Sequence, residues 1–138
     1  MTVKNIIFDL GGVILDLDFT RMINSFEQLG VKDFSSYFNP QKQVDFFEEL
    51  ELGHISPDVF YDEFRKATKS QLTDEVIEEN WNLILKDFQK ERMNLLTDLS
   101  ADFSLYLFSN TNAIHAKCFE QRCIEQMGQP LATYFTKA

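Results

Sequence analysis

Two short apolar runs near opposite ends of the chain predict buried strands. The run "VKNIIFDL", residues 3–10, is rich in β-branched and aromatic residues, and Gly11 and Gly12 end it. The run "DFSLYLFSN", residues 102–110, is almost continuously apolar in the same way. Such runs are typical of parallel strands that are covered on both faces. Two strands are too few for a sheet of this kind, so we expect a partner or a longer chain to complete it.

Between these runs, apolar residues recur every three or four positions, which predicts helices. The start of one helix is marked with particular clarity by Ser56-Pro57-Asp58, which supplies a hydroxyl cap, a proline at the first helical position and an acid in the first turn. Further helices are expected close to the second apolar run. The predicted helices cover residues 19–29, 44–50, 57–67, 73–88, 90–101 and 112–127.

The order of these elements is strand, four helices, helix, strand, helix. This order predicts an α/β fold, with an incomplete Rossmann-like parallel sheet and an inserted four-helix domain. We assign residues 1–16 and 90–138 to the partial α/β core and residues 17–89 to the helical insert.

Composition narrows the class of protein. The 138 residues are 44% hydrophobic and include 14 phenylalanines, enough to bury a core. The net charge of -9 argues against a nucleic-acid partner, and no apolar stretch approaches the length needed to span a membrane. The cysteines, Cys118 and Cys123, do not suggest a disulfide framework, and no signal segment is apparent. The sequence therefore predicts a cytoplasmic protein.

Polar residues follow both predicted strands. Asp9 ends the first strand, and Ser109 and Asn110 end the second. Ligands of open α/β sheets bind beyond the carboxyl ends of the strands, so neighbouring strands would bring these groups to one crevice. A carboxylate beside a hydroxyl and free amides suits phosphoryl transfer: the carboxylate attacks phosphorus, the hydroxyl and amides bind phosphate oxygens, and a divalent ion offsets the charge.

The motifs themselves resemble those of the haloacid dehalogenase (HAD) superfamily. "FDLGGVILDLD" is similar to the first motif of that family and "LYLFSNTN" to its second. The helical insert falls where the family carries its type-1 helical cap. The match is closest to the α-glucose-1-phosphate phosphatase-like subgroup. The resemblance implies a phosphoric-monoester hydrolase that acts on small phosphorylated metabolites, sugar phosphates among them.

The resemblance also assigns roles to individual residues. It implies that Asp9 is the nucleophile and a ligand of the cofactor Mg²⁺, and that the backbone carbonyl of Gly11 is a second ligand of this ion. It implies that Ser109 and the backbone of Asn110 bind the transferring phosphate.

The chain departs from the family pattern in two ways. Gly11 stands where many members carry an aspartate that protonates the leaving group, so a good leaving group, water, Asp16 or Asp18 would have to compensate. The lysine and the acidic cluster of the third and fourth motifs normally follow the region where this chain stops. The resemblance therefore implies an N-terminal portion of a phosphatase. Loss of such electrostatic elements typically costs about 10²-fold or more in rate, so we expect weak or no activity from these 138 residues alone.

Two other functions remain open. The chain could be a non-catalytic interaction module that forms homo-oligomers through an unpaired sheet edge, or a dehalogenase that uses the same aspartate. Among other titratable residues, His115 and Cys118 have a spacing that permits a metal, but without a second pair a structural role is favoured. His54 and Glu51 lie between two predicted cap helices and are candidates for a contact with substrate.

Overall fold

The computed structural model describes residues 2–39 and 41–137. The chain divides into two units. The sheet unit comprises Met1–Leu17, Leu85–Asn110 and Lys117–Ala138, and the helical unit comprises Asp18–Ile84 and Thr111–Ala116. Residues 1, 40 and 138, which the predicted domain ranges include, lie outside the described part of the chain. The assignment of a core and a cap to the ranges given above stays a prediction.

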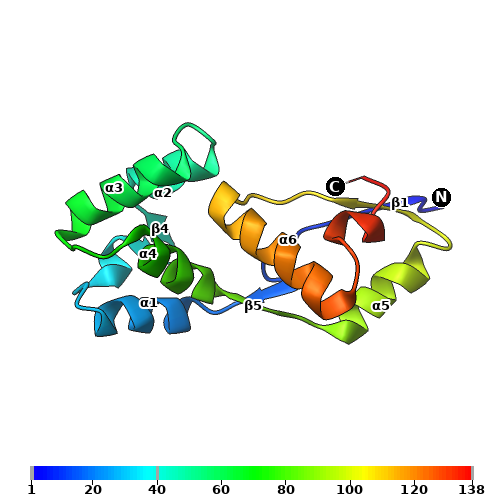
Figure 1. Ribbon diagram of the computed structural model, residues 1–138. Coiled ribbons are helices and arrows are strands. Elements are labelled where there is room, and N and C mark those ends of the chain that lie inside the picture. Colours follow the sequence, from blue (N-terminus) through cyan, green and yellow to red (C-terminus); the bar gives the residue numbers. More distant parts are fainter. Residues whose placement is uncertain (1, 40, 138) are drawn as a thin grey trace. The chain divides into compact units, whose positions relative to one another are not determined.

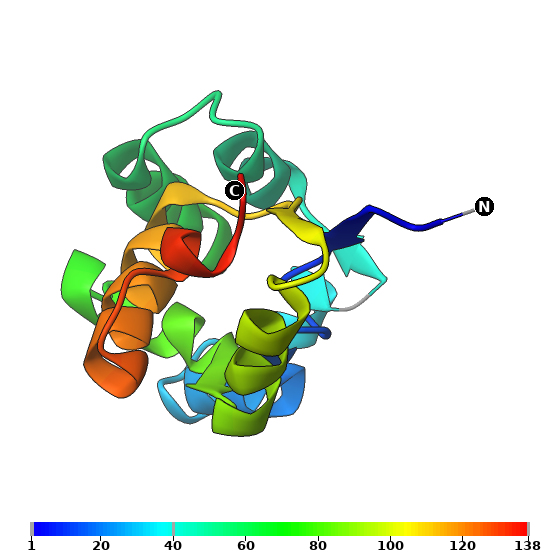
Figure 2. The ribbon, with the colours of Figure 1, turned by 90° about the vertical axis from the view of Figure 1, so that its right-hand side faces the viewer.

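The sheet unit contains the predicted parallel strand pair. Strand β1 (Asn5–Phe8) pairs in parallel with β6 (Ser104–Leu107), with Ile6 opposite Leu105, and the two strands run side by side in both ribbon views (Figure 1, Figure 2). Helix α5 (Lys90–Leu99) lies between them in the sequence, and α6 (Ala113–Met127) follows β6. The α/β class and the parallel sheet are thus confirmed. The buried residues of this unit include Met93, Leu96, Leu105, Phe119, Cys123 and Leu131.

The predicted burial of the first strand on both faces is wrong. Along β1, Asn5 and Ile7 are exposed, and the side chain of Ile7 is 71% exposed. Within the described residues, β1 has only β6 as a strand partner. In the described part of the chain one edge of β1 therefore lacks a strand partner, and Ile7 is left open to solvent.

A second strand pair was missed by the sequence pattern. Strand β2 (Leu15–Leu17) pairs antiparallel with β5 (Leu85–Phe88). The prediction of one helix over 73–88 is therefore wrong: α4 (Asp74–Trp81) ends early, and the short 3₁₀ turn η2 (Asn82–Ile84) leads into β5. Apolar residues at 84, 85 and 88 fit the spacing of a helix, but pairing with β2 determines the outcome.

Side chains of α6 hold β5 in place. The guanidinium of Arg122 donates a hydrogen bond to the carbonyl of Leu85 at 2.8 Å. The backbone N–H of Phe88 donates to the side-chain oxygen of Gln126 at 2.9 Å. The β2–β5 pair is thereby fixed to a long helix, although it has only two strands of its own.

The helical unit contains the expected amphipathic helices (Figure 1). They are α1 (Phe19–Gln28), α2 (Asp45–Glu51), α3 (Pro57–Thr68) and α4, and the short elements η1 (Phe34–Ser36), β3 (Phe38–Asn39) and β4 (Lys42–Gln43) connect α1 to α2. The predicted cap of α3 is confirmed, because the hydroxyl of Ser56 accepts a hydrogen bond from the N–H of Val59. A final 3₁₀ turn, η3 (Leu131–Tyr134), belongs to the sheet unit.

An aromatic core fills the helical unit. Phe26 and Phe34 stack with their ring centroids 4.5 Å apart, and Phe60 stacks on Trp81 at the same distance. Such ring pairs add to the free energy gained by burying their area. The aromatic residues that are at most 2% exposed are Phe26, Phe34, Phe47, Phe60, Phe64 and Trp81.

The first turn of α6 belongs to the helical unit. The ring of His115 lies 4.1 Å from that of Trp81, and the side-chain oxygen of Asn112 accepts a hydrogen bond from the N–H of His115. Burial disfavours the charged imidazolium and lowers the pKa of His115 from 6.5 to about 4. No helix within residues 2–39 and 41–137 combines the length and the apolar character that crossing a bilayer would require.

Candidate functional site

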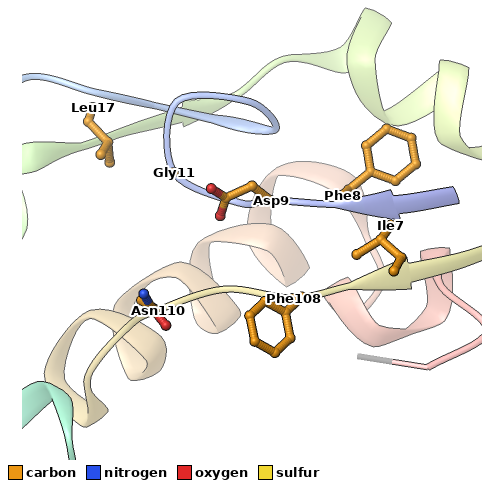
Figure 3. Close-up of a pocket in the computed structure, with 7 residues that line it drawn as sticks. All are labelled: Ile7, Phe8, Asp9, Gly11, Leu17, Phe108 and Asn110. Atoms are coloured by element: carbon orange, nitrogen blue, oxygen red, sulfur yellow. The ribbon is translucent and has the colours of Figure 1, made fainter.

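A pocket of about 460 Å³ opens at the carboxyl ends of β1 and β6, within the sheet unit. This is the position at which open α/β sheets bind their ligands. Figure 3 shows the side chains that surround it. The residues that line the pocket are Ile7, Phe8, Asp9, Gly11, Leu17, Phe108 and Asn110.

The carboxylate of Asp9 lies directly after β1 and is exposed in this pocket. One of its oxygens, Oδ1, accepts a hydrogen bond from the N–H of Leu10 at 2.7 Å. Among the residues that the structure describes, none forms an ion pair with Asp9. The second oxygen is therefore available to a ligand.

The chain turns back sharply after Asp9. The carbonyl of Leu10 accepts hydrogen bonds from the N–H groups of Val13, Ile14 and Leu15, and the N–H of Gly12 donates to the carbonyl of Leu15 at 2.8 Å. This turn requires Gly12 at a φ of +80°, in the left-handed region that favours glycine. The turn places Gly11 and Leu17 in the lining of the pocket.

The wall formed by this turn is tight at Gly11. A Cβ atom added there would lie 3.1 Å from Cδ1 of Leu17, closer than ordinary van der Waals contact. The absence of a side chain at this position thus has a packing consequence as well as the chemical one noted above.

The three residues after β6 do not all line the pocket. Phe108 and Asn110 line the pocket, whereas Ser109 is half-buried and does not belong to its lining. The structure thus brings Asp9, Gly11 and Asn110 to one pocket and leaves the hydroxyl of Ser109 outside the lining.

The two alternative proton donors are already engaged. The guanidinium of Arg92 binds the carboxylate of Asp16 with both arms, at 2.8 and 3.2 Å, and holds the pKa of Asp16 below its usual range. Asp18 caps α1, because its Oδ1 accepts a hydrogen bond from the N–H of Arg21 at 3.0 Å. An ionised Asp16 carries no proton to give, which argues against it as a general acid.

Asp9 and Gly11, the two residues that the family resemblance assigns to Mg²⁺, both line the pocket. A carboxylate and a backbone carbonyl are oxygen groups suited to this ion. In residues 2–39 and 41–137, no group of three or more His, Cys, Asp or Glu side chains could hold a metal. Mg²⁺ is commonly bound by one or two carboxylates and keeps several waters or substrate oxygens, so the two groups fit part of such a site.

Other candidates from the sequence lie elsewhere. Nδ1 of the exposed His54 lies within hydrogen-bonding distance, 2.9 Å, of a carboxylate oxygen of Glu49 in the helical unit, and Glu51 ends α2. Cys118 lies 3.5 Å from the guanidinium of Arg122. Sequence reasoning missed Arg92 and the apolar wall residues of the pocket. A lone arginine inside a helix, 76 positions from its partner, gives no local signal of its contact.

The parallel strand pair, the carboxylate after its first strand and the helical insertion are the features expected of a HAD hydrolase. No family model matches the chain. It is 30% identical over 135 residues to the D-ribitol-5-phosphate phosphatase of Bacteroides thetaiotaomicron, a match that covers 98% of this chain and 66% of the relative. The chain therefore spans about two thirds of the length of that relative.

Two solved structures are similar over nearly the whole chain. One is a HAD family enzyme from Bacteroides thetaiotaomicron in complex with magnesium and inorganic phosphate, with a TM-score of 0.92, 31% identity and coverage of 99% of this chain and 67% of that one. The other is a predicted HAD-like family hydrolase from Porphyromonas gingivalis, with a TM-score of 0.84, 29% identity and coverage of 98% and 64%. This protein belongs to the HAD family.

Proposed function

We propose that the chain carries the nucleophile of a Mg²⁺-dependent phosphoric-monoester hydrolase whose substrate is a small phosphorylated metabolite of the sugar or sugar-alcohol phosphate class. The observation that carries this proposal is the exposed carboxylate of Asp9, which forms no ion pair within residues 2–39 and 41–137 and shares a pocket at the strand ends with Asn110. The substrate class is supported by the name of the D-ribitol-5-phosphate phosphatase, and the ion by the complex of a relative with magnesium and phosphate. A metabolite substrate also agrees with the predicted cytoplasmic location.

The reaction would proceed in two displacements at phosphorus. An oxygen of Asp9 attacks phosphorus, the bond from phosphorus to the ester oxygen breaks, and the departing oxygen keeps the electron pair. Water then attacks the acyl phosphate and releases inorganic phosphate and free Asp9. Bound Mg²⁺, held by Asp9 and the carbonyl of Gly11, would supply compensation for the negative charges that meet in the first step.

The remaining residues would bind the phosphate and the leaving group. Asn110 lines the same pocket as Asp9, so its backbone is assigned the phosphate contact first, whereas Ser109 could join only if its hydroxyl turned toward the pocket. Gly11 offers no acid and Asp16 is bound to Arg92, so solvent would protonate the leaving oxygen. Substrates with good leaving groups should therefore react faster.

The test is phosphoryl transfer to Asp9, measured in the 138-residue chain itself. The chain is mixed with Mg²⁺ and an aryl phosphate, and both the released aryl alcohol and the phosphorylated peptide are quantified by rapid quench and mass spectrometry. We expect a phosphoryl group on the peptide that contains Asp9, and its loss in Asp9→Asn and after chelation of Mg²⁺. Slow overall turnover is compatible with the proposal, because the single transfer is what the described residues would perform. A label that persists in Asp9→Asn would refute it.

A second candidate function rests on the exposed edge of β1. Within the described residues β1 has a strand partner on one side only, and its residue Ile7 is 71% exposed. An exposed, apolar strand edge is a template for pairing with a second copy of the chain. Light scattering after size exclusion tests this candidate: a dimer that Ile7→Lys converts to monomer would support it, and a monomer in both cases would exclude it.

A further inference from the structure

One wall of the pocket is made by the turn that follows Asp9. Gly11 and Leu17 line the pocket at the two ends of this turn, and Val13 lies between them. A Cβ atom added at Gly11 would lie 3.1 Å from Cδ1 of Leu17, so the wall has little free space there. The position of the turn therefore decides where the carbonyl of Gly11 and the side chain of Leu17 lie with respect to the carboxylate.

Arg92 of α5 donates hydrogen bonds to two residues of this turn, Asp16 and Val13. Its Nη1 and Nη2 donate to the two carboxylate oxygens of Asp16, at 2.8 and 3.2 Å, in the forked geometry that only arginine provides. Nη1 also donates to the backbone carbonyl of Val13 at 3.3 Å. One side chain thus fixes both the middle of the turn and the strand that returns from it.

The ion pair between Arg92 and Asp16 is better suited to fixing the position of the turn than to stabilising the fold. The side chains of Arg92 and Asp16 are 41% and 37% exposed, and ion pairs with such exposure add little to the stability of a fold. Each partner nevertheless favours the charged form of the other: the pKa of Asp16 is lowered and that of Arg92 is raised. The pair is therefore intact at neutral pH, and its loss should be felt first by the turn that it holds.

We propose that Arg92 is a positioning residue for the site around Asp9: its fork on Asp16 and its bond to Val13 hold the turn that places Gly11 in the wall of the nucleophile's pocket. The proposal rests on the proposed function of Asp9 and adds to it a residue that does not touch the substrate. Arg92→Lys keeps the charge but lacks the fork, so it should lose most of this effect.

The first experiment compares phosphoryl transfer in Arg92→Lys, Asp16→Asn and the unchanged chain, with Mg²⁺ and an aryl phosphate. We expect the rate of transfer at saturation to fall about tenfold in both variants, because small displacements of a reacting geometry are costly. The concentration of aryl phosphate at half-saturation and the midpoint of thermal unfolding should stay close to those of the unchanged chain. Arg65→Lys is the matched control: Arg65 pairs with Asp62 and Asp74 in the helical unit, and its loss should leave the transfer rate unchanged.

The second experiment does not depend on chemistry. Amide hydrogen exchange is measured at Gly12 and Ile14, whose N–H groups donate within the turn. We expect exchange about tenfold faster in Arg92→Lys and Asp16→Asn, and unchanged exchange at both amides in Arg65→Lys.

The outcomes separate this inference from the function on which it rests. Label that persists in Asp9→Asn would defeat the proposed function, and the positioning role with it. Transfer that depends on Asp9 but is unchanged in Arg92→Lys would defeat the positioning role alone. If the unchanged chain transfers no phosphoryl group, amide hydrogen exchange tests the positioning role by itself. Equal exchange rates at Gly12 and Ile14 in all variants would overturn that role.

Discussion

Phenylalanine is buried in the aromatic core of the helical unit but exposed at the strand ends of the sheet unit. In the helical unit, Phe47 is 1% exposed and packs against the rings of Phe60 and Trp81. In the sheet unit, Phe108 is 75% exposed and lines the pocket that contains Asp9. The aromatic core thus buries its rings, whereas the strand ends leave apolar area open where a ligand is expected. The following predictions test this division, beginning with the largest effect.

Truncation in the aromatic core should have the largest effect. We expect Phe47→Ala to lower the free energy of unfolding by about 3–5 kcal/mol, because it removes a buried ring and leaves a cavity. Phe108→Ala, at the exposed strand end, should stay within about 0.5 kcal/mol. Urea unfolding followed by the fluorescence of the single tryptophan, Trp81, measures both. Equal losses in the two variants would contradict the division.

Acid should weaken the helical unit through His115. The pKa of His115 is lowered to about 4 by burial, whereas the unfolded chain binds the proton near 6.5. The stabilising contribution of the neutral ring is therefore complete above pH 6.5 and is lost as the pH falls toward 4, by roughly 3 kcal/mol in total. The free energy of unfolding, measured across this range, should fall less steeply in His115→Gln. Identical slopes would show that the ring does not titrate as its burial implies.

A methyl group added at Gly11 should lower the free energy of unfolding by a smaller amount, and shortening Leu17 should restore most of it. Gly11→Ala places a methyl group 3.1 Å from Cδ1 of Leu17, and we expect a loss of about 1 kcal/mol in the free energy of unfolding. Leu17→Ala in the same chain should relieve most of this loss. Gly12→Ala is the control, because its cost comes from a φ of +80° and not from contact, so Leu17→Ala should not relieve it. A double-mutant cycle without coupling at Gly11 would refute the contact.

The smallest effect is expected on the open face of β1. Ile7→Thr keeps a β-branched side chain at a site that is 71% exposed, so the free energy of unfolding should change by less than about 0.5 kcal/mol. A larger loss would mean that another chain or segment covers this face in solution. Repeating the measurement over a tenfold range of protein concentration would identify a second copy as the cover.

The sequence predicted well those elements that carry their own local signals. Ser56 caps α3, Gly30 follows α1 at a φ of +94°, and both strands of the parallel pair lie within the apolar runs. These features depend on residues a few positions apart. The end of α4 could not be predicted from such local signals, because β5 forms by pairing with β2, nearly 70 residues earlier in the chain.

The candidate site shows the same limit. Asp9 and Asn110 could be placed at one strand edge from their positions after two apolar runs, and both line the pocket. The direction of Ser109 depends on the local path of the chain after β6, which an apolar pattern does not specify. The contact between Arg92 and Asp16 joins two charged residues of ordinary appearance, and only the folded chain brings them together. Their roles in chemistry stay predictions.

The division into units has a topological consequence. Because each unit is assembled from separated stretches of sequence, the polypeptide crosses between them four times, at 17/18, 84/85, 110/111 and 116/117. Cutting the backbone at any single crossing leaves three covalent connections intact. A protease that nicks one junction should therefore release neither half, and no single contiguous gene fragment can encode either unit alone.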